Sequence, residues 1–356
     1  MRILYVNSTH RWGGVKTWCL RSACGLAARG HQVTVAGRRD DPFLTACREA
    51  GLPVLPYAFG ASWSPAAFLH FWRLIHRERI ELVVCNTGRD LSTAGLAARA
   101  AGLPVVHRVG AGADFRDTWA RRATHRLVVS RVLVPAGVVR SEMLGRFAWI
   151  RPEQALVSWN AAEASPAVVG SGQPDRIVCL ARLSHGKGLE TLLAAAARLR
   201  EHGLDFQLDL VGEGPLEGTL HEIVRTLDLD DHVRLPGFLR PASGVLALAT
   251  VAVLPSLREG FPNTLVEYWA AGLAVVASDL PGVREALGDE EAAMLVPPGD
   301  AQALAEALGR LLVDEELRNS LAERGLRRAR SCFGCAQEAE RLERLYLDCI
   351  AARSAR

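Results

Sequence analysis

The sequence feature that most constrains the fold is an internal repeat of one supersecondary unit. Each copy consists of a short apolar strand, a glycine loop, a helical pattern and a second strand. In the first copy the strand, the loop and the second strand occupy residues 2–6, 12–14 and 32–36. In the second copy they occupy residues 176–180, 184–188 and 207–211. Continuous apolar strands between helices are typical of parallel sheets covered on both faces. The repeat therefore predicts two doubly wound α/β domains of similar plan.

Length and composition agree with two globular domains. The chain has 356 residues, and a domain typically takes roughly 100–200. Hydrophobic residues make up 49% and charged residues 23%, which excludes wholesale disorder. The 42 basic and 39 acidic residues leave a net charge of +3. This balance is unlike that of a chain that holds nucleic acid through its overall charge, so we expect no nucleic-acid partner.

Small and turn-forming residues at 161–166 and 170–174 predict the linker between the domains. We expect an N-terminal domain over residues 1–165, a C-terminal domain over 166–335, and a C-terminal helix over 336–356 that packs back on the N-terminal domain. Open α/β sheets bind ligands beyond the carboxyl ends of their strands. Two such domains facing each other would form a central cleft lined by the strand-end loops.

Cysteine usage and hydropathy indicate the compartment. The eight cysteines are scattered and mostly lie in apolar stretches, as small buried residues do in a reducing compartment. Cys332 and Cys335 form an isolated C-x-x-C with no second ligand pair, so no metal site is predicted. The N-terminus lacks a signal-peptide pattern, and the apolar run at 245–254 is far shorter than the ~20 residues of a membrane span. We expect a cytoplasmic protein.

The strongest chemical signal is the segment from Glu259 to Glu267, which follows the buried strand 251–254 and begins a helix. Pro262 fits the first helical turn, where a missing N–H costs little. An anion site suited to phosphate is predicted at the unpaired backbone N–H groups of Asn263, Thr264 and Leu265. Glu267 lies one turn further on in an apolar stretch. A buried carboxylate there needs donors, and a ribose diol supplies two.

Two cations flank the turn after strand 176–180. Arg182 and Lys187 lie at the same predicted sheet edge and could neutralise a diphosphate. Gly13 and Gly14 permit close approach of backbone to a phosphate. Gly212 begins a glycine loop in which Glu217 replaces the third glycine of a dinucleotide motif. That loop is therefore interpreted as packing near a nucleotide base, without NAD.

The first half offers candidates for binding a second substrate. They lie at predicted strand ends and are His107, Arg108, Asn86 and Arg89, with Asp90 and Asp114 as weaker acid–base candidates. No catalytic triad, metal-ligand cluster or pair of carboxylates at glycosidase spacing stands out.

A basic, aromatic and amphipathic helix is predicted at residues 68–79. Its apolar face either packs on the sheet with the basic face in water, or the helix lies on an anionic membrane surface. Residues 116–126, with Trp119, Arg121 and Arg122, would extend the basic patch. If the helix lies on a membrane surface, the protein is peripheral on the inner face of that membrane.

These segments together resemble the family 4 retaining glycosyltransferases, which have the GT-B fold. The resemblance rests on Gly13-Gly14 with 26–31, on 181–188, on 210–214, and on 259–267 with 271–278. It implies a sugar-nucleotide donor held mainly by the C-terminal domain, with the acceptor on the N-terminal domain. By that resemblance Arg182 and Lys187 bind the diphosphate in place of a metal ion, and Glu267 binds the ribose hydroxyls.

The resemblance further implies roles for the neighbouring residues. Glu259 and the backbone from Phe261 to Leu265 would meet the donor sugar and phosphates, and Gly14 would touch the phosphates from the other domain. Many members carry His-Gly after the strand that is 104–109 here. This chain has Val109-Gly110 at that place, which leaves His107 as the catalytic candidate.

The sequence thus predicts a metal-independent hexosyltransferase that needs no cofactor. It would move a sugar from a nucleoside-diphosphate sugar to a saccharide or lipid-linked acceptor, with retention at the anomeric carbon, in cell-surface polysaccharide or lipopolysaccharide synthesis. Two alternatives are a GT-B sugar-nucleotide epimerase or hydrolase, and a non-catalytic subunit that binds a nucleotide sugar. Because this chain lacks His-Gly after strand 104–109, the alternative of a non-catalytic subunit stays open.

Overall fold

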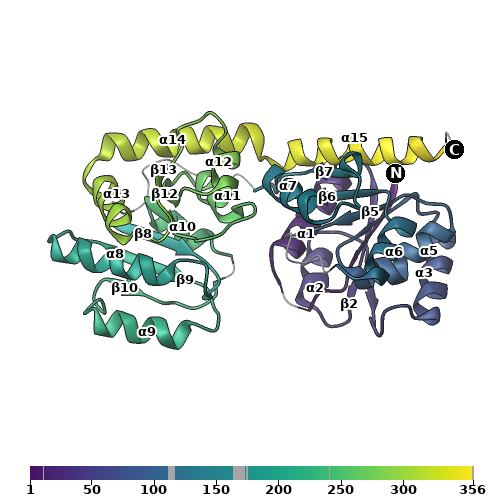
Figure 1. Cartoon of the computed structure of the whole chain (residues 1–356), viewed down its shortest axis with the longest axis horizontal. Coiled ribbons are helices and arrows are strands. Elements are labelled where there is room, and N and C mark those ends of the chain that lie inside the picture. Colours follow the sequence, from purple (N-terminus) through teal and green to yellow (C-terminus); the bar gives the residue numbers. More distant parts are fainter. Residues whose placement is uncertain (11, 111–116, 163–172, 174, 240, 355–356) are drawn as a thin grey trace. The chain divides into compact units, whose positions relative to one another are not determined.

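The chain forms two compact units in the computed structural model (Figure 1), which describes residues 1–10, 12–110, 117–162, 173, 175–239 and 241–354. The first unit consists of Met1–Ala161 together with Cys335–Arg356, and the second of Ala162–Gly334. Most of the predicted linker and Asp114 lie outside the described residues.

The described part of the first unit contains a parallel sheet of seven strands in the order β3-β2-β1-β4-β5-β6-β7. The strands are β1 (Arg2–Asn7), β2 (Gln32–Arg38), β3 (Val54–Tyr57), β4 (Leu82–Cys85), β5 (Val105–Arg108), β6 (Arg131–Val134) and β7 (Ala155–Val157). The helices are α1 (Gly14–Ala28), α2 (Pro42–Glu49), α3 (Pro65–Arg77), α4 (Gly88–Asp90), α5 (Leu96–Ala100), α6 (Trp119–Val128), α7 (Gly137–Arg146) and α15 (Cys335–Ser354), with a π-helical turn at Leu91–Gly95.

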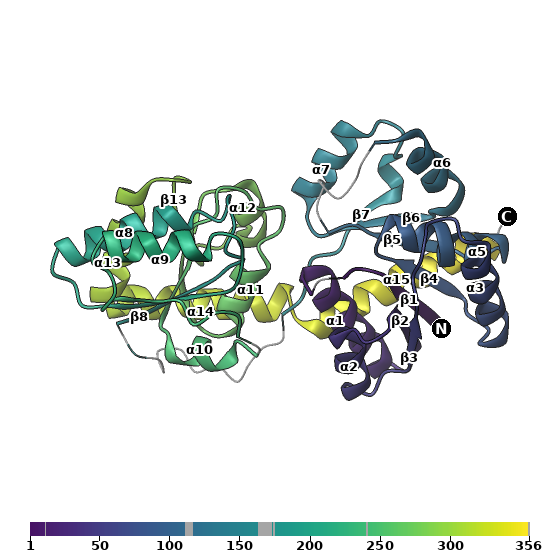
Figure 2. The ribbon, with the colours of Figure 1, turned by 90° about the horizontal axis from the view of Figure 1, so that it is seen from below.

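Helices cover both faces of this sheet, as Figures 1 and 2 show. Apolar residues of α1, α2 and α15 form one buried cluster with alternate residues of the strands, including Ile3, Tyr5, Val33 and Val35. Helices α3, α5 and α6 gather on the other side of the sheet. Because both faces are covered, β4 is buried along its whole length.

The second unit has a parallel sheet of six strands within its described residues, in the order β10-β9-β8-β11-β12-β13. The strands are β8 (Arg176–Leu180), β9 (Gln207–Val211), β10 (Val233–Arg234), β11 (Val251–Leu254), β12 (Ala274–Ser278) and β13 (Met294–Val296). The helices are α8 (Leu189–Glu201), α9 (Glu217–Thr226), α10 (Ser243–Leu248), α11 (Asn263–Ala270), α12 (Pro281–Leu287), α13 (Ala301–Val313) and α14 (Glu315–Cys332).

The repeat predicted from the sequence is confirmed. Strands β8, β9 and β11 occupy in the second sheet the places of β1, β2 and β4 in the first. In each sheet the strand order reverses beside the first strand, between β1 and β4 and between β8 and β11. Such a reversal is the position at which open α/β sheets bind ligands, at the carboxyl ends of the strands.

Helix α15 follows the second unit in sequence but packs on α1 of the first. Gly25 makes this approach possible, because a Cβ atom there would lie 2.8 Å from the Cβ of Ala339. The indole of Trp18 donates to Glu338 Oε1 at 2.5 Å, and the amide of Ala161 donates to Glu338 Oε2 at 3.1 Å. Burial raises the pKa of Glu338 to about 7, with Arg108 acting in the opposite direction.

This carboxyl group should make the unfolding free energy depend on pH. Its folded-state pKa of about 7 exceeds the ordinary 4.5, so between these values the folded chain holds a proton that the unfolded chain has lost. Stability therefore falls as pH rises through that window. Between pH 5 and 7.5 the wild type should lose on the order of 1–3 kcal/mol more than Glu338→Gln in urea unfolding.

The control is Glu340→Gln, which removes a carboxylate from the same helix at an exposed position paired with Arg344. It should keep the wild-type dependence on pH. Parallel pH profiles for Glu338→Gln and the wild type would show that Glu338 titrates normally in the folded chain.

Candidate functional site

Three loops gather at the carboxyl end of the second sheet, at its strand-order reversal. The loop after β11 is joined to the loop after β8 by the amide of Leu257, which donates to Gly186 O at 2.9 Å. The loop after β9 is joined to the same loop through Leu183, whose amide donates to Glu213 O at 3.0 Å. The predicted residues Arg182, Lys187 and Glu259 are therefore carried by loops in mutual contact.

Lys187 and Glu259 form an ion pair, with Nζ 2.6 Å from Oε1. The hydroxyl of Ser256 donates to the same oxygen at 2.8 Å. The Glu259 side chain is 11% exposed and that of Lys187 30% exposed, so the ammonium is held near the surface by a mostly buried carboxylate. An ammonium group has three protons, so Lys187 keeps donors for an anion while its position is fixed. Sequence reasoning named both residues but missed that they pair.

Arg182 lies at the same edge and is exposed. Among the described residues, no carboxylate lies within 4 Å of its guanidinium group. An arginine with no ion-pair partner in the described part of the chain, on the same loop as the positioned ammonium of Lys187, makes this edge of the sheet suitable for a diphosphate.

Glycines allow these loops to come so close. Gly188 has φ 65° and precedes α8, and a Cβ atom there would lie 1.9 Å from Pro255 O. Gly212 has φ 152°, and its Cβ would lie 1.8 Å from Ala181 O. A side chain at either position would push apart the loops that carry the ionic groups.

The start of α11 differs from the prediction. Pro262 precedes the helix as its N-cap and does not lie in its first turn. The amide of Asn263 donates to Phe261 O at 3.0 Å, and the amide of Leu265 donates to Pro262 O at 3.0 Å. The prediction that these two amides are unpaired is therefore wrong, because the chain turns tightly at Phe261–Pro262. In the described part of the chain no backbone acceptor bonds the amide of Thr264, which keeps that donor.

Glu267 is half-buried, so the expectation of a carboxylate enclosed by apolar residues is only partly met. Its neighbours on α11 are the fully buried Tyr268 and Trp269. The hydroxyl of Tyr268 accepts from the Leu180 amide at 2.6 Å, and the indole of Trp269 donates to Ala292 O at 2.9 Å. These bonds anchor α11 to β8 and to the segment that precedes β13, and so fix the position of Glu267.

In the first unit, Gly13 and Gly14 are both exposed at the start of α1. Gly13 is the N-cap in extended conformation, and no atom of the described residues lies within 4 Å of the place a Cβ would take. Its carbonyl accepts from the Lys16 amide at 2.9 Å. The turn leaves open space for a ligand beside the backbone.

His107 and Arg108 do not face the surface. His107 is 6% exposed, and burial, followed by the nearby His125, lowers its pKa to about 3. Arg108 is 2% exposed, donates to Asn160 Oδ1 at 2.6 Å and lies over the Trp18 ring. This placement contradicts the prediction that both face an acceptor. The sequence does not decide this placement, because a polar residue in a short β-strand has the same apolar neighbours whether its side chain points into the core or toward the edge.

Asn86 and Arg89 do lie at the carboxyl edge of the first sheet. Asn86 directly follows β4, and its side-chain amide donates to Val6 O at 2.9 Å. Arg89 is half-buried in α4.

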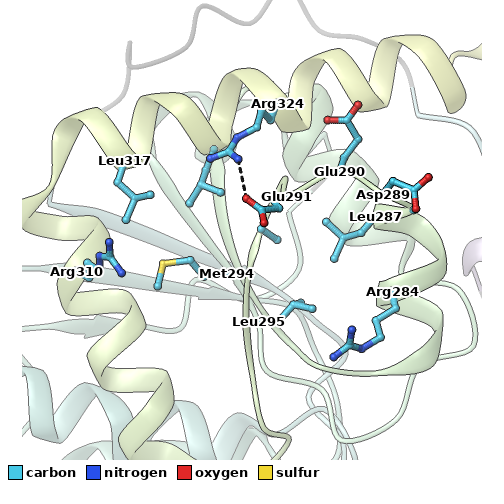
Figure 3. Close-up of a pocket in the computed structure, with 13 residues that line it drawn as sticks. Arg284, Leu287, Asp289, Glu290, Glu291, Met294, Leu295, Arg310, Leu317 and Arg324 are labelled. Atoms are coloured by element: carbon cyan, nitrogen blue, oxygen red, sulfur yellow. Dashed lines mark hydrogen bonds and ion pairs between the residues drawn. The ribbon is translucent and has the colours of Figure 1, made fainter.

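A cavity of about 430 Å³ lies elsewhere in the second unit (Figure 3). It is bounded by the end of α12, the segment leading into β13, and α13 and α14. Its wall includes Arg324, which pairs with Glu291 at 3.4 Å, and Arg284, which pairs with Asp279. None of the predicted site residues lines it.

No group of three or more histidine, cysteine, aspartate or glutamate side chains within the described residues is arranged to hold a metal ion. None of the helices in this part of the chain combines the length and the apolar character that crossing a membrane requires.

Known families match both halves of the chain. The family described as Glycosyltransferase Family 4 matches residues 12–161, and the family described as Glycosyl transferases group 1 matches residues 174–314. Together they cover well over half of the sequence.

Curated relatives are similar over part of their length. The amylovoran biosynthesis glycosyltransferase AmsK of Erwinia amylovora is 39% identical over 148 residues, which are 39% of this chain and 36% of that protein. The MMP alpha-(1->4)-mannosyltransferase of Mycolicibacterium hassiacum is 32% identical over 268 residues, covering 74% of this chain and 63% of that protein. The chain thus matches little more than a third of the length of the first of these.

Solved structures are similar over the whole chain. The structure of Anabaena Alr3699/HepE, in complex with UDP and glucose, has a TM-score of 0.79 at 20% identity, and the match covers 97% of this chain and 99% of that one. The two parallel-sheet units are those of the GT-B fold.

The close approach at Gly212 predicts the effect of a small side chain. Gly212→Ala should lower the free energy of unfolding by at least about 1–3 kcal/mol, because the new Cβ meets Ala181 O and the φ is strained. Gly218→Ala is the control, since a Cβ there in α9 would meet no atom of the residues that the structure describes within 4 Å. Urea unfolding of both variants measures the difference, and equal midpoints would contradict the structure of this loop.

Proposed function

Since the chain belongs to the family 4 glycosyltransferases, we propose that it transfers a sugar from a nucleoside-diphosphate sugar to a saccharide or lipid-linked acceptor. The observation that carries the proposal is the cationic edge of the second sheet. There, loops in backbone contact carry Arg182, the Lys187–Glu259 pair and the start of α11. The binding of UDP by a protein of the same fold supports the same ligand class.

Each group at this edge has a role in the proposal. Arg182 and Lys187 neutralise the diphosphate, and the amide of Thr264 adds a neutral donor. Glu259 positions Lys187 and reaches the donor sugar, while Glu267 accepts hydrogen bonds from the ribose hydroxyls. Gly212 lets the loop after β9 pack beside the nucleotide base.

The chemistry follows from the charge that develops when the glycosidic bond to phosphate breaks. The leaving diphosphate gains negative charge, and preorganised cations stabilise it more strongly than they stabilise the donor in its ground state. We propose that Arg182 and Lys187 supply this stabilisation without a bound metal ion. The acceptor hydroxyl attacks the anomeric carbon on the same face from which the diphosphate leaves. An oxygen of the leaving diphosphate takes the acceptor proton. Because attack and departure occur on one face, the anomeric configuration is retained.

The family and the names of relatives such as AmsK support a place in cell-surface polysaccharide or lipopolysaccharide synthesis. Incubation with a panel of nucleoside-diphosphate sugars, with and without saccharide acceptors, tests this proposal against its rivals. A glycosylated acceptor supports transfer. A free sugar or an epimer formed from the donor alone would instead identify a hydrolase or an epimerase.

Removal of the ammonium group should slow transfer. Lys187→Ala is expected to lower kcat/KM for the donor by an amount equivalent to about 2–4 kcal/mol, as for loss of one charge-stabilising donor. Arg198→Ala removes one positive charge from an exposed position on α8 and should change kcat/KM little. A value for Lys187→Ala within a few-fold of the wild type would place the diphosphate elsewhere.

We also propose that the first unit binds an anionic membrane surface through α3 and α6. Both helices lie on the same side of the sheet (Figures 1 and 2). Large apolar side chains are exposed there, at Trp63 and Trp72 around α3 and at Trp119 and Leu127 of α6. The exposed basic residues of the two helices include Arg73, Arg77, Arg121 and Arg126. Exposed aromatic and aliphatic groups beside arginines are typical of interfacial helices.

Vesicle sedimentation checks this surface. The wild type should bind phosphatidylglycerol vesicles in a salt-sensitive manner, and Trp119→Ser with Leu127→Ser should lower the bound fraction several-fold. Val313→Ser, which changes an exposed apolar residue of the second unit, should bind as the wild type does. Equal recovery on neutral and anionic vesicles would refute the membrane proposal.

A further inference from the structure

Two arginines converge on the loop after β1 in the first unit. Arg38 ends β2, and Arg89 lies in α4 just after β4, so they come from the strands on either side of β1. Arg38 Nε donates to Ser8 O at 2.7 Å, directly beyond β1. Burial and then the positive charge of Arg89 lower the pKa of Arg38, while Asp90 and Asp41 act in the opposite direction.

The carboxylates around this pair are already engaged. Asp90 is completely buried and accepts from the amides of Ser8 at 3.2 Å and Thr87 at 2.8 Å. Asp41 is 2.5 Å from the ammonium of the buried Lys16. In the part of the chain that the structure describes, neither arginine has a carboxylate within 4 Å. The two positive charges are therefore not balanced by an ion pair.

Buried donors at the same place have no acceptor among the described residues. They are Arg38 Nη2, Arg89 Nε and Asn7 Nδ2, and Asn7 is completely buried at the end of β1. Asn86 Oδ1 is a buried acceptor that receives no hydrogen bond from the described residues. Leaving such a group unsatisfied costs about 1–3 kcal/mol. An oxyanion bound at this sheet edge would give these donors an acceptor and offset the two like charges.

The position also fits a ligand site, because it lies at the reversal of strand order between β1 and β4. We propose that Arg38 and Arg89 bind the phosphate of a phosphate-bearing acceptor. Asn7 Nδ2 donates to the phosphate, and Asn86 Oδ1 accepts from a hydroxyl group of the sugar next to it. A guanidinium group can bind phosphate through two parallel N–H bonds. This inference rests on the proposed function, since it names the acceptor class of that reaction.

The test measures phosphate-ester binding to the full chain in saturating UDP, which fills the proposed donor site. One arm titrates glucose 1-phosphate by calorimetry, and the other uses phosphatidylcholine vesicles that contain a polyprenyl phosphate. Vesicles with the same charge density of phosphatidylglycerol correct for adhesion to the membrane surface. Arg38→Gln and Arg89→Gln should each bind at least tenfold more weakly than the wild type in the arm that matches the natural acceptor.

Arg48→Gln is the matched control, because it removes an exposed arginine from α2 of the same unit. It should bind as the wild type does, and all three variants should keep the wild-type affinity for UDP. Arg38 also donates to the backbone at Ser8. If Arg38→Gln therefore lowers Tm, the binding result for Arg89→Gln alone decides the test. Protection of the wild type against heat by the same ligand gives a readout without any variant.

The inference is overturned if neither probe binds the wild type saturably, or if Arg89→Gln and Arg48→Gln bind both probes equally. Failure of the proposed donor site looks different: UDP itself would not bind to the wild type, whatever the arginine variants do. Binding of glucose 1-phosphate alone would identify a free sugar phosphate as the acceptor class, and binding only to polyprenyl phosphate vesicles would identify a lipid-linked one.

Discussion

The second unit depends on the close backbone contact between the loop after β8 and the loops after β9 and β11. Gly188 and Gly212 allow that contact, because at each of them the space for a side chain is occupied by a carbonyl oxygen. The contact brings Lys187 to 2.6 Å from Glu259, although 72 residues separate them in sequence. A cation held in this way can meet a diphosphate without first being ordered, which is the condition for electrostatic preorganisation.

The fold was predictable because its signals are local and repeated. Short apolar runs such as 2–6 and 176–180, each followed by a glycine loop and a helix, indicate a parallel sheet wherever they occur. The place of the cationic edge followed from the same pattern, since carboxyl ends of parallel strands share one edge. Arg182, Lys187 and Glu259 were identified for that reason.

Other features were not predictable, because they depend on contacts between distant residues. Sequence gave no sign that Lys187 and Glu259 pair, or that Arg108 is enclosed by Trp18 and Asn160. The paired amides of Asn263 and Leu265 result from a tight turn at Pro262, which the residue types alone allow but do not require. Arg38 was not predicted, because the strand expected at 32–36 continues to Arg38 in the structure, so that Arg38 did not stand out as a strand-end residue.

The most direct test of the account is hydrogen exchange of the full chain with and without UDP. The account predicts slower exchange on UDP binding in segments 182–188, 212–216 and 259–267, with no change in the segment 287–295 beside the separate cavity. Protection that leaves 182–188 and 259–267 untouched would contradict the claim that the edge bearing the Lys187–Glu259 pair binds the nucleotide.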